Sequence, residues 1–166
     1  MMLSGKTVAI TRSQDDASEF ISLAKENGAI PVALPTIELV SKGEKIVDEF
    51  LESVEKYRPD YSVFMSSKAV KLLFDTAKQL GKLEKLQLAV ANTIVMSVGP
   101  KTSLTLEAEG IKVNHQPTTY SSVGVGEEFT KLNAVGKKVI VPRSGASTPF
   151  LKELLSKIGI DVLEIH

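Results

Sequence analysis

The 166-residue sequence contains no cysteine and only two histidines. The absence of cysteine excludes disulfides, iron–sulfur clusters, thiolate zinc sites and cysteine nucleophiles. The two histidines, His115 and His166, are far apart in the sequence, so no metal site is expected. Lysine plus arginine and aspartate plus glutamate each number 20, which gives a formal net charge of zero. A broad basic surface for nucleic acid is therefore not expected.

Long hydrophobic runs are also absent. No stretch approaches the roughly 20 apolar residues that a membrane helix needs, and the N-terminus lacks the apolar segment and cleavage site of a signal peptide. We therefore expect a cytoplasmic protein with no membrane partner. The chain is 43% hydrophobic and 24% charged, which is typical of soluble globular proteins. Its length suffices for one domain, or for one domain and a fragment of another.

Short apolar runs alternate with amphipathic helical patterns along the chain. Asp15 or Asp16 is expected to cap the first helix, and Gly28 to end it. Because the strands are nearly continuous apolar runs, the alternation predicts an α/β fold whose parallel sheet has helices on both faces. Strands or extended segments are expected at 7–10, 30–40, 61–65, 93–98, 111–113, 138–141 and 162–165. Helices are expected at 15–27, 44–56, 68–80, 101–109, 120–132 and 147–158.

The expected strand-to-helix loops are rich in hydroxyl groups, glycine and cations. Ligands of open parallel sheets bind beyond the carboxyl ends of the strands, and helix N-termini favour anions. Serine and threonine are also the usual N-cap residues, so capping alone explains any single loop. Five such loops, two with an arginine and two with a lysine, favour an anionic ligand. The loops comprise residues 11–13, 66–68, 97–102, 117–122 and 142–147.

Familiar catalytic motifs are incomplete. The segment 99–102 (Gly-Pro-Lys-Thr) is similar to the end of a P-loop, but Pro100 replaces the glycine before the lysine. The segment 124–126 (Gly-Val-Gly) falls inside or at the start of an expected helix, so it is no dinucleotide fingerprint. No Gly-x-Ser-x-Gly elbow is present. A phosphate-handling enzyme is therefore disfavoured, whereas a non-catalytic α/β module that binds a small anion or a protein partner stays open.

In their order and spacing, these motifs resemble those of the uroporphyrinogen-III synthase family. The resemblance runs through nearly the whole chain, with Met65 at a position where the family has threonine. The segments that carry it are 8–12, 63–70, 97–102, 110–113, 117–122, 141–145 and the following helical segment up to Gly159.

The resemblance implies two flavodoxin-like α/β lobes joined by an extended linker. Residues 1–36 would then form the βα part of the first lobe with the outgoing linker, residues 37–161 a complete second lobe, and residues 162–166 the start of the return linker. The remainder of the first lobe, with a tyrosine that family members usually carry after the return strand begins, would lie outside these residues. We therefore expect this chain alone to have at most a low enzymatic activity, and a homodimer through the incomplete lobe is possible.

The resemblance also implies an activity, the cyclisation of hydroxymethylbilane to uroporphyrinogen III in haem biosynthesis, with loss of water and inversion of ring D. It implies no cofactor and no metal. The substrate is a polycarboxylated linear tetrapyrrole, which suits loops rich in hydroxyl and N–H groups. Thr102 is the expected catalytic residue. The expected substrate-binding residues are Thr11, Arg12, Ser66, Ser67, Lys68, Gly99, Lys101, Tyr120, Ser121, Ser122, Arg143 and Ser144.

Overall fold

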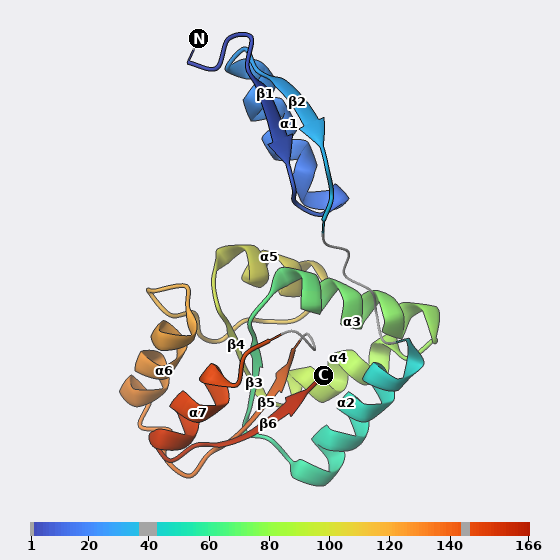
Figure 1. Cartoon of the computed structure of the whole chain (residues 1–166). Coiled ribbons are helices and arrows are strands. Elements are labelled where there is room, and N and C mark those ends of the chain that lie inside the picture. The colour runs from blue at the N-terminus through green and yellow to red at the C-terminus, as the bar shows by residue number, and fades with distance from the viewer. Residues whose placement is uncertain (1, 37–42, 144–146) are drawn as a thin grey trace. The chain divides into compact units, whose positions relative to one another are not determined.

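The computed structural model describes residues 2–36, 43–143 and 147–166. The chain divides into two compact units, Met1–Val40 and Ser41–His166 (Figure 1). Among the described residues, no helix is long and apolar enough to cross a membrane. The elements of the first unit are β1 (Thr7–Ile10), α1 (Gln14–Glu26) and β2 (Ile30–Ala33). Those of the second unit are α2 (Glu44–Tyr57), β3 (Tyr61–Phe64), α3 (Ser67–Gln79), α4 (Leu83–Ala91), β4 (Ile94–Ser97), α5 (Pro100–Ala108), α6 (Ser122–Lys131), β5 (Lys138–Pro142), α7 (Phe150–Lys157) and β6 (Asp161–Ile165).

The first unit is a single βαβ element. β1 and β2 pair in parallel, with Thr7 opposite Ile30. Helix α1 begins one residue after Ser13, which is its N-cap, so the expected cap at Asp15 or Asp16 is wrong. Gly28 has a φ of 82°, a conformation that favours glycine, and it turns the chain from α1 toward β2. Among the described residues of this unit, the large apolar side chains that remain exposed are Met2, Phe20, Leu23, Ile30, Val32 and Leu34.

The second unit is built on a four-stranded parallel sheet with the order β4-β3-β5-β6. β3 lies in the interior and pairs with β4 along its whole length, from Tyr61 opposite Ile94 to Phe64 opposite Ser97. β5 pairs with β6 from Lys138 opposite Asp161 to Pro142 opposite Ile165. Because all four strands are parallel, their carboxyl ends meet at one edge of the sheet (Figure 1).

Helices cover both faces of this sheet, as the sequence predicts. On one face, Phe50 of α2, Phe74 of α3 and Leu86 of α4 pack with Phe64 of β3. On the other face, Phe129 of α6 and Leu155 of α7 pack with side chains of β3 and β5. Burial of these large apolar side chains supplies most of the favourable free energy of folding, at about 1.5–3 kcal/mol each. This confirms the predicted α/β fold.

Three segments differ from their expected structure or extend it. α4 was not expected, although its buried Leu86 and Val90 have helical spacing. Residues 111–113 form no strand, and the chain near them makes only an isolated bridge from Met96 to His115. The side-chain oxygen of Asn114 accepts the Val95 N–H at 2.8 Å, in place of a backbone carbonyl. The residues expected to open a return linker form most of β6.

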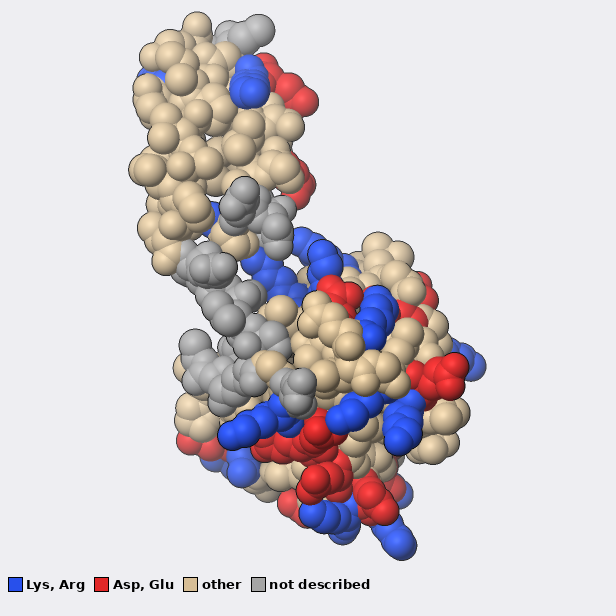
Figure 2. All heavy atoms as spheres, turned by 90° about the vertical axis from the view of Figure 1, so that its right-hand side faces the viewer, with Lys and Arg blue, Asp and Glu red and all other residues tan. Residues whose placement is uncertain are grey.

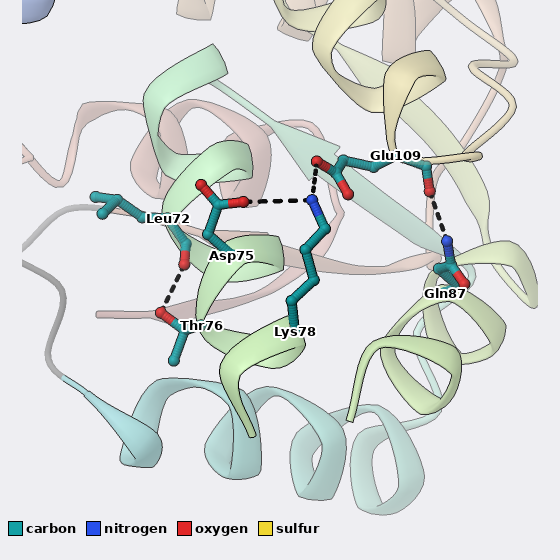
Figure 3. Close-up of polar contacts among 6 residues, drawn as sticks. All are labelled: Leu72, Asp75, Thr76, Lys78, Gln87 and Glu109. Atoms are coloured by element: carbon teal, nitrogen blue, oxygen red, sulfur yellow. Dashed lines mark hydrogen bonds and ion pairs between the residues drawn. The ribbon is translucent and has the colours of Figure 1, made fainter. Parts of the chain in front are cut away.

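Polar contacts fix the far end of α5 against α3 and α4 (Figure 3). Lys78 Nζ of α3 lies 2.7 Å from Glu109 Oε1 and 3.3 Å from Asp75 Oδ1. Gln87 Nε2 of α4 donates to the backbone oxygen of Glu109 at 2.8 Å. Within α3, the hydroxyl of Thr76 donates to the Leu72 carbonyl at 2.7 Å. These contacts hold in place the helix whose opposite end begins at the carboxyl edge of the sheet.

Charges of both signs are mixed on one face of the second unit (Figure 2). Figure 2 shows lysine and arginine beside aspartate and glutamate on the face that it presents. Exposed pairs such as Lys56 with Glu52, 2.9 Å apart, contribute little to stability because water screens both charges. Among the described residues on the face shown in Figure 2, neither sign forms an extended patch.

Candidate functional site

The candidate site lies at the carboxyl edge of the second unit's sheet, at the starts of α3, α5 and α6. α3 follows the end of β3 and α5 follows the end of β4. The segment 117–122, which leads into α6, reaches the β4–α5 loop through Tyr120, as described below. The peptide dipoles of a helix place partial positive charge at its N-terminus, so these helix starts suit anions.

The β3–α3 loop is organised by Ser66. Its side-chain oxygen accepts the Ala69 N–H at 3.5 Å, and its backbone oxygen accepts the Val70 N–H at 3.1 Å. Ser66 is therefore the N-cap of α3, and its side chain provides a hydrogen-bond acceptor for one of the backbone N–H groups in the first turn of the helix. Ser67 and Lys68 form the first turn of α3, and both are half-buried.

The β4–α5 loop is organised by Gly99, which is the N-cap of α5, with Pro100 at the first helical position. The backbone N–H groups of Thr102 and Ser103 both donate to the Gly99 oxygen at 3.0 Å. Thr102 thus lies within the first turn and is not the cap. It is only 4% exposed, so a ligand can reach little of its surface. Lys101, one residue earlier, is exposed.

A chain of hydroxyl groups ties this loop to the segment before α6. Ser97 Oγ, at the end of β4, lies 2.6 Å from Ser103 Oγ of α5. Ser103 Oγ donates to Gln116 Oε1 at 2.8 Å. The backbone N–H of Ser97 also donates to the His115 carbonyl at 3.1 Å. These bonds fix the position of residues 115–116 relative to β4 and α5.

The segment 117–122 brings Tyr120 against Gly99. A Cβ atom added to Gly99 would lie only 3.0 Å from Tyr120 Cγ, so the ring packs directly on the glycine. The next residue, Ser121, is the N-cap of α6 and accepts the Gly124 N–H at 3.2 Å. Ser122 begins α6 and is half-buried. Of the residues predicted for the site, the structure therefore brings Gly99 and Tyr120 into direct contact.

Arg143, predicted as a carboxylate ligand, is paired within the protein. Its Nη1 lies 3.4 Å from Glu164 Oε1 on β6, and the two side chains are 11% and 9% exposed. These two buried atoms make no hydrogen bond, so the contact is an ion pair held by charge alone. His166 Nε2 lies 3.9 Å from the other oxygen of Glu164. The predicted residue Ser144 lies outside the described residues.

Two predicted residues, Thr11 and Arg12, belong to the first unit, and both are exposed. The Arg12 guanidinium carbon lies 4.4 Å from the centre of the Phe20 ring, which is a cation–π contact. The backbone oxygen of Thr11 accepts the Thr36 hydroxyl at 3.0 Å.

Two of the three tyrosines lie away from the carboxyl edge. Tyr57 ends α2, and burial of its hydroxyl, with the Asp161 carboxylate nearby, raises its pKa. The backbone oxygen of Tyr57 accepts a hydrogen bond from the Lys138 ammonium, 3.3 Å away, at the amino end of β5. Tyr61 packs edge-on against Phe129, with ring centres 5.1 Å apart. Tyr120 is therefore the tyrosine at the candidate site.

The chemistry available at the edge consists of hydroxyls, backbone N–H groups and cations. Among residues 2–36, 43–143 and 147–166, no three of the histidine, aspartate and glutamate side chains are grouped so that they could hold a metal ion. Sequence reasoning did not find Glu164, although its even spacing from Val162 along β6 indicates that both face the same side of the sheet.

Comparison with known proteins identifies one family. The family model described as uroporphyrinogen-III synthase HemD matches residues 18–166. The uroporphyrinogen-III synthase of Synechococcus elongatus is 27% identical over 166 residues, which cover 98% of this chain and 60% of that protein. A protein of Methanothermobacter thermautotrophicus that carries the same name provisionally is 27% identical over 157 residues, or 94% of this chain and 59% of that protein.

The fold is also found in solved structures. A mutant uroporphyrinogen III synthase from the extremely thermophilic bacterium Thermus thermophilus aligns with a TM-score of 0.70, over 96% of this chain and 60% of that one. At 17% sequence identity, this likeness shows the fold alone. The chain spans about three-fifths of the length of the relatives that it matches.

Proposed function

Because the chain belongs to the uroporphyrinogen-III synthase family, we propose that it takes part in the cyclisation of hydroxymethylbilane to uroporphyrinogen III. In this reaction the linear tetrapyrrole loses water, ring D is inverted, and the macrocycle closes. The observation that carries the proposal is the family match over residues 18–166. No step of the proposed reaction requires a cofactor.

The proposed role of the second unit is to hold the carboxylates of the substrate at the carboxyl edge of its sheet. The starts of α3, α5 and α6 each favour a nearby carboxylate by about 0.3–1 kcal/mol. Hydroxyl and N–H donors bind carboxylates without placing a strong nucleophile beside the electrophilic carbon that forms when water leaves. Ser66, Ser121 and Lys101 are the proposed contacts on these three helix starts.

Catalysis would then depend chiefly on the conformation that the bound chain adopts. A linear tetrapyrrole has many conformations, and ring closure needs its two ends in contact. Fixing several carboxylates at defined positions replaces that conformational search with one bound geometry, which accelerates an intramolecular reaction. Thr102 is the proposed polar group beside the reacting rings, through the small part of its side chain that is exposed.

The proposal is tested by locating the binding surface. The 166-residue chain is titrated with uroporphyrin III, the stable oxidised form of the product, and amide chemical shifts are followed. Shifts concentrated at residues 66–69, 99–103 and 120–124 are expected. Shifts confined to the opposite edge of the sheet, around Asp60 and Lys138, would reject the proposed surface.

The reaction itself is read from the isomer that forms. Freshly prepared hydroxymethylbilane cyclises to the type I isomer without an enzyme, so the type III isomer is the signature of catalysis. A type III yield that rises with protein concentration supports the proposed activity. Tetrapyrrole binding with type I product alone would limit the chain to a binding role.

A further inference from the structure

The backbone conformation at Gly99 does not require a glycine. Its φ of 179° and ψ of 177° describe extended backbone that any residue adopts. The constraint is space: an added Cβ would lie 3.0 Å from Tyr120 Cγ and 3.2 Å from both Cβ and Cδ1 of the same side chain. The ring of Tyr120 therefore occupies the volume that a side chain at position 99 would need.

The backbone that carries Tyr120 is held tightly on both sides of the residue. The Ser121 N–H donates to the Thr119 carbonyl at 2.8 Å. The same carbonyl oxygen lies so close to Gly124 that a Cβ there would overlap it. Gly99 therefore leaves room for the Tyr120 ring, and Gly124 leaves room for the Thr119 carbonyl that precedes Tyr120.

Despite this close support, Tyr120 is 60% exposed. An exposed aromatic side chain on a backbone that is already held in place is suited to binding, because a ligand can cover the ring without first ordering the loop that carries it. It lies between Gly99 and Ser121, the N-caps of two helices. The site thus places one apolar ring beside two helix starts that favour carboxylates.

We propose that Tyr120 packs against a pyrrole ring of the bound tetrapyrrole, and that Gly99 is the positioning residue that lets the Tyr120 ring lie at that place. The identity of the ligand rests on the proposed function. A pyrrole with its acetate and propionate chains combines a flat π-face with carboxylates, and the neighbouring features of the site match these two parts. The Tyr120 hydroxyl has no part in this contact.

The consequence for binding is specific. Loss of the ring removes an aromatic contact, which weakens binding roughly five- to tenfold. Loss of the hydroxyl alone changes affinity little. An alanine at position 99 pushes the ring away by a few tenths of an ångström or more. Because the ring is exposed, it can yield with little cost to the fold, so the expected change is in binding and not in stability.

The test is a double-mutant cycle on the 166-residue chain, with uroporphyrin III as the fluorescent probe. Tyr120→Ala and Gly99→Ala should each weaken binding five- to tenfold, and Tyr120→Phe should stay within about twofold of the wild type. Gly99→Ala should have no further effect when Tyr120 is already alanine. Gly99→Ser adds a Cβ but keeps a good N-cap residue, so it should weaken binding as Gly99→Ala does.

A second probe separates the ring contact from a general loss of structure. Butane-1,2,3,4-tetracarboxylate has carboxylates but no aromatic face, so its affinity should not change in Tyr120→Ala. Equal losses for both probes, or wild-type affinity for uroporphyrin in Tyr120→Ala, would overturn the inference while the proposed function stands. No uroporphyrin binding by the wild type would overturn both.

Discussion

Arg143 and Glu164 form a buried ion pair across two neighbouring strands, with Nη1 and Oε1 3.4 Å apart. The pair lies at the carboxyl ends of β5 and β6, where the backbone N–H of Arg143 also donates to the Ile165 carbonyl at 2.8 Å. Both side chains are about nine-tenths buried, so water compensates neither charge well. In this structure Glu164 supplies the carboxylate that was expected from a ligand.

Glu164→Gln should destabilise the second unit more than a typical surface substitution. The change keeps the size of the side chain but leaves the buried guanidinium without its counter-charge, at a cost of about 3 kcal/mol. The free energy of unfolding in urea measures the effect. The double variant Arg143→Met with Glu164→Leu removes both charges and should lie within about 1 kcal/mol of the wild type. Equal losses in the two variants would contradict the ion-pair interpretation.

Gly124→Ala and Gly126→Ala make the same change within one helix and should differ strongly. A Cβ at Gly124 would overlap the backbone oxygen of Thr119, which cannot move without distorting the turn. We expect a loss of at least about 2 kcal/mol. At Gly126 the nearest atom is the end of the flexible Leu154 side chain, at 3.0 Å, and alanine has the higher helix propensity. The free energy of unfolding of this control variant should lie within about 1 kcal/mol of the wild-type value. Similar losses at both positions would show that the contact of Gly124 with Thr119 does not constrain the turn.

Asp60 should make the stability of the second unit depend on pH under acidic conditions. The Lys138 N–H bonds to the Asp60 carboxylate and, together with the Lys137 ammonium, lowers its pKa below the ordinary 3.8. A lowered pKa stabilises the folded state above pH 3.8, and the contribution disappears as the pH falls through the folded-state value. Asp60→Asn should therefore unfold more easily at neutral pH, by less than about 1 kcal/mol because the carboxylate is partly exposed.

The measurement for Asp60 is the difference in unfolding free energy between the wild type and Asp60→Asn from pH 7 to pH 2. The difference should be constant above pH 5 and should shrink at lower pH. A difference that stays unchanged down to pH 2 would show that the Asp60 charge contributes nothing to stability.

Thr102 can be tested with two substitutions that separate its hydroxyl from its volume. Thr102→Ser keeps the hydroxyl, whereas Thr102→Val keeps the shape of this 4% exposed side chain. If the hydroxyl binds a ligand carboxylate, Val should weaken uroporphyrin III binding at least about tenfold, and Ser should not. Wild-type affinity in Thr102→Val would leave Thr102 as a packing residue of α5.

The sheet could be predicted from the sequence because its strands are continuous apolar runs between helical patterns. The helix caps were harder: Ser13 precedes two aspartates, and composition alone does not show which of the three residues starts α1. The expected strand at 111–113 failed because the Asn114 side chain takes the hydrogen bond that a strand carbonyl would have accepted. Local sequence patterns do not reveal that a side-chain oxygen takes the place of a backbone acceptor.

The candidate site was predictable in its parts but not in its pairings. Parallel strands bring the loops that follow them to one edge, so Ser66 and Gly99 could be assigned to that edge from order alone. The contact of Gly99 with Tyr120 depends on how the segment 117–122 passes the start of α5, which no local spacing encodes. The pairing of Arg143 with Glu164 depends on the register of β5 and β6.

The interior position of β3 has a consequence for the nascent chain. It pairs with β5 from Tyr61 opposite Val139, two residues that are 78 apart in the sequence. At about 5–20 residues per second, ribosomes need roughly 4–16 s to synthesise that interval. During this time one edge of a strand with buried Tyr61, Val63 and Phe64 has no partner strand from its own chain. That edge therefore needs protection, for example by a chaperone, from pairing with another nascent chain.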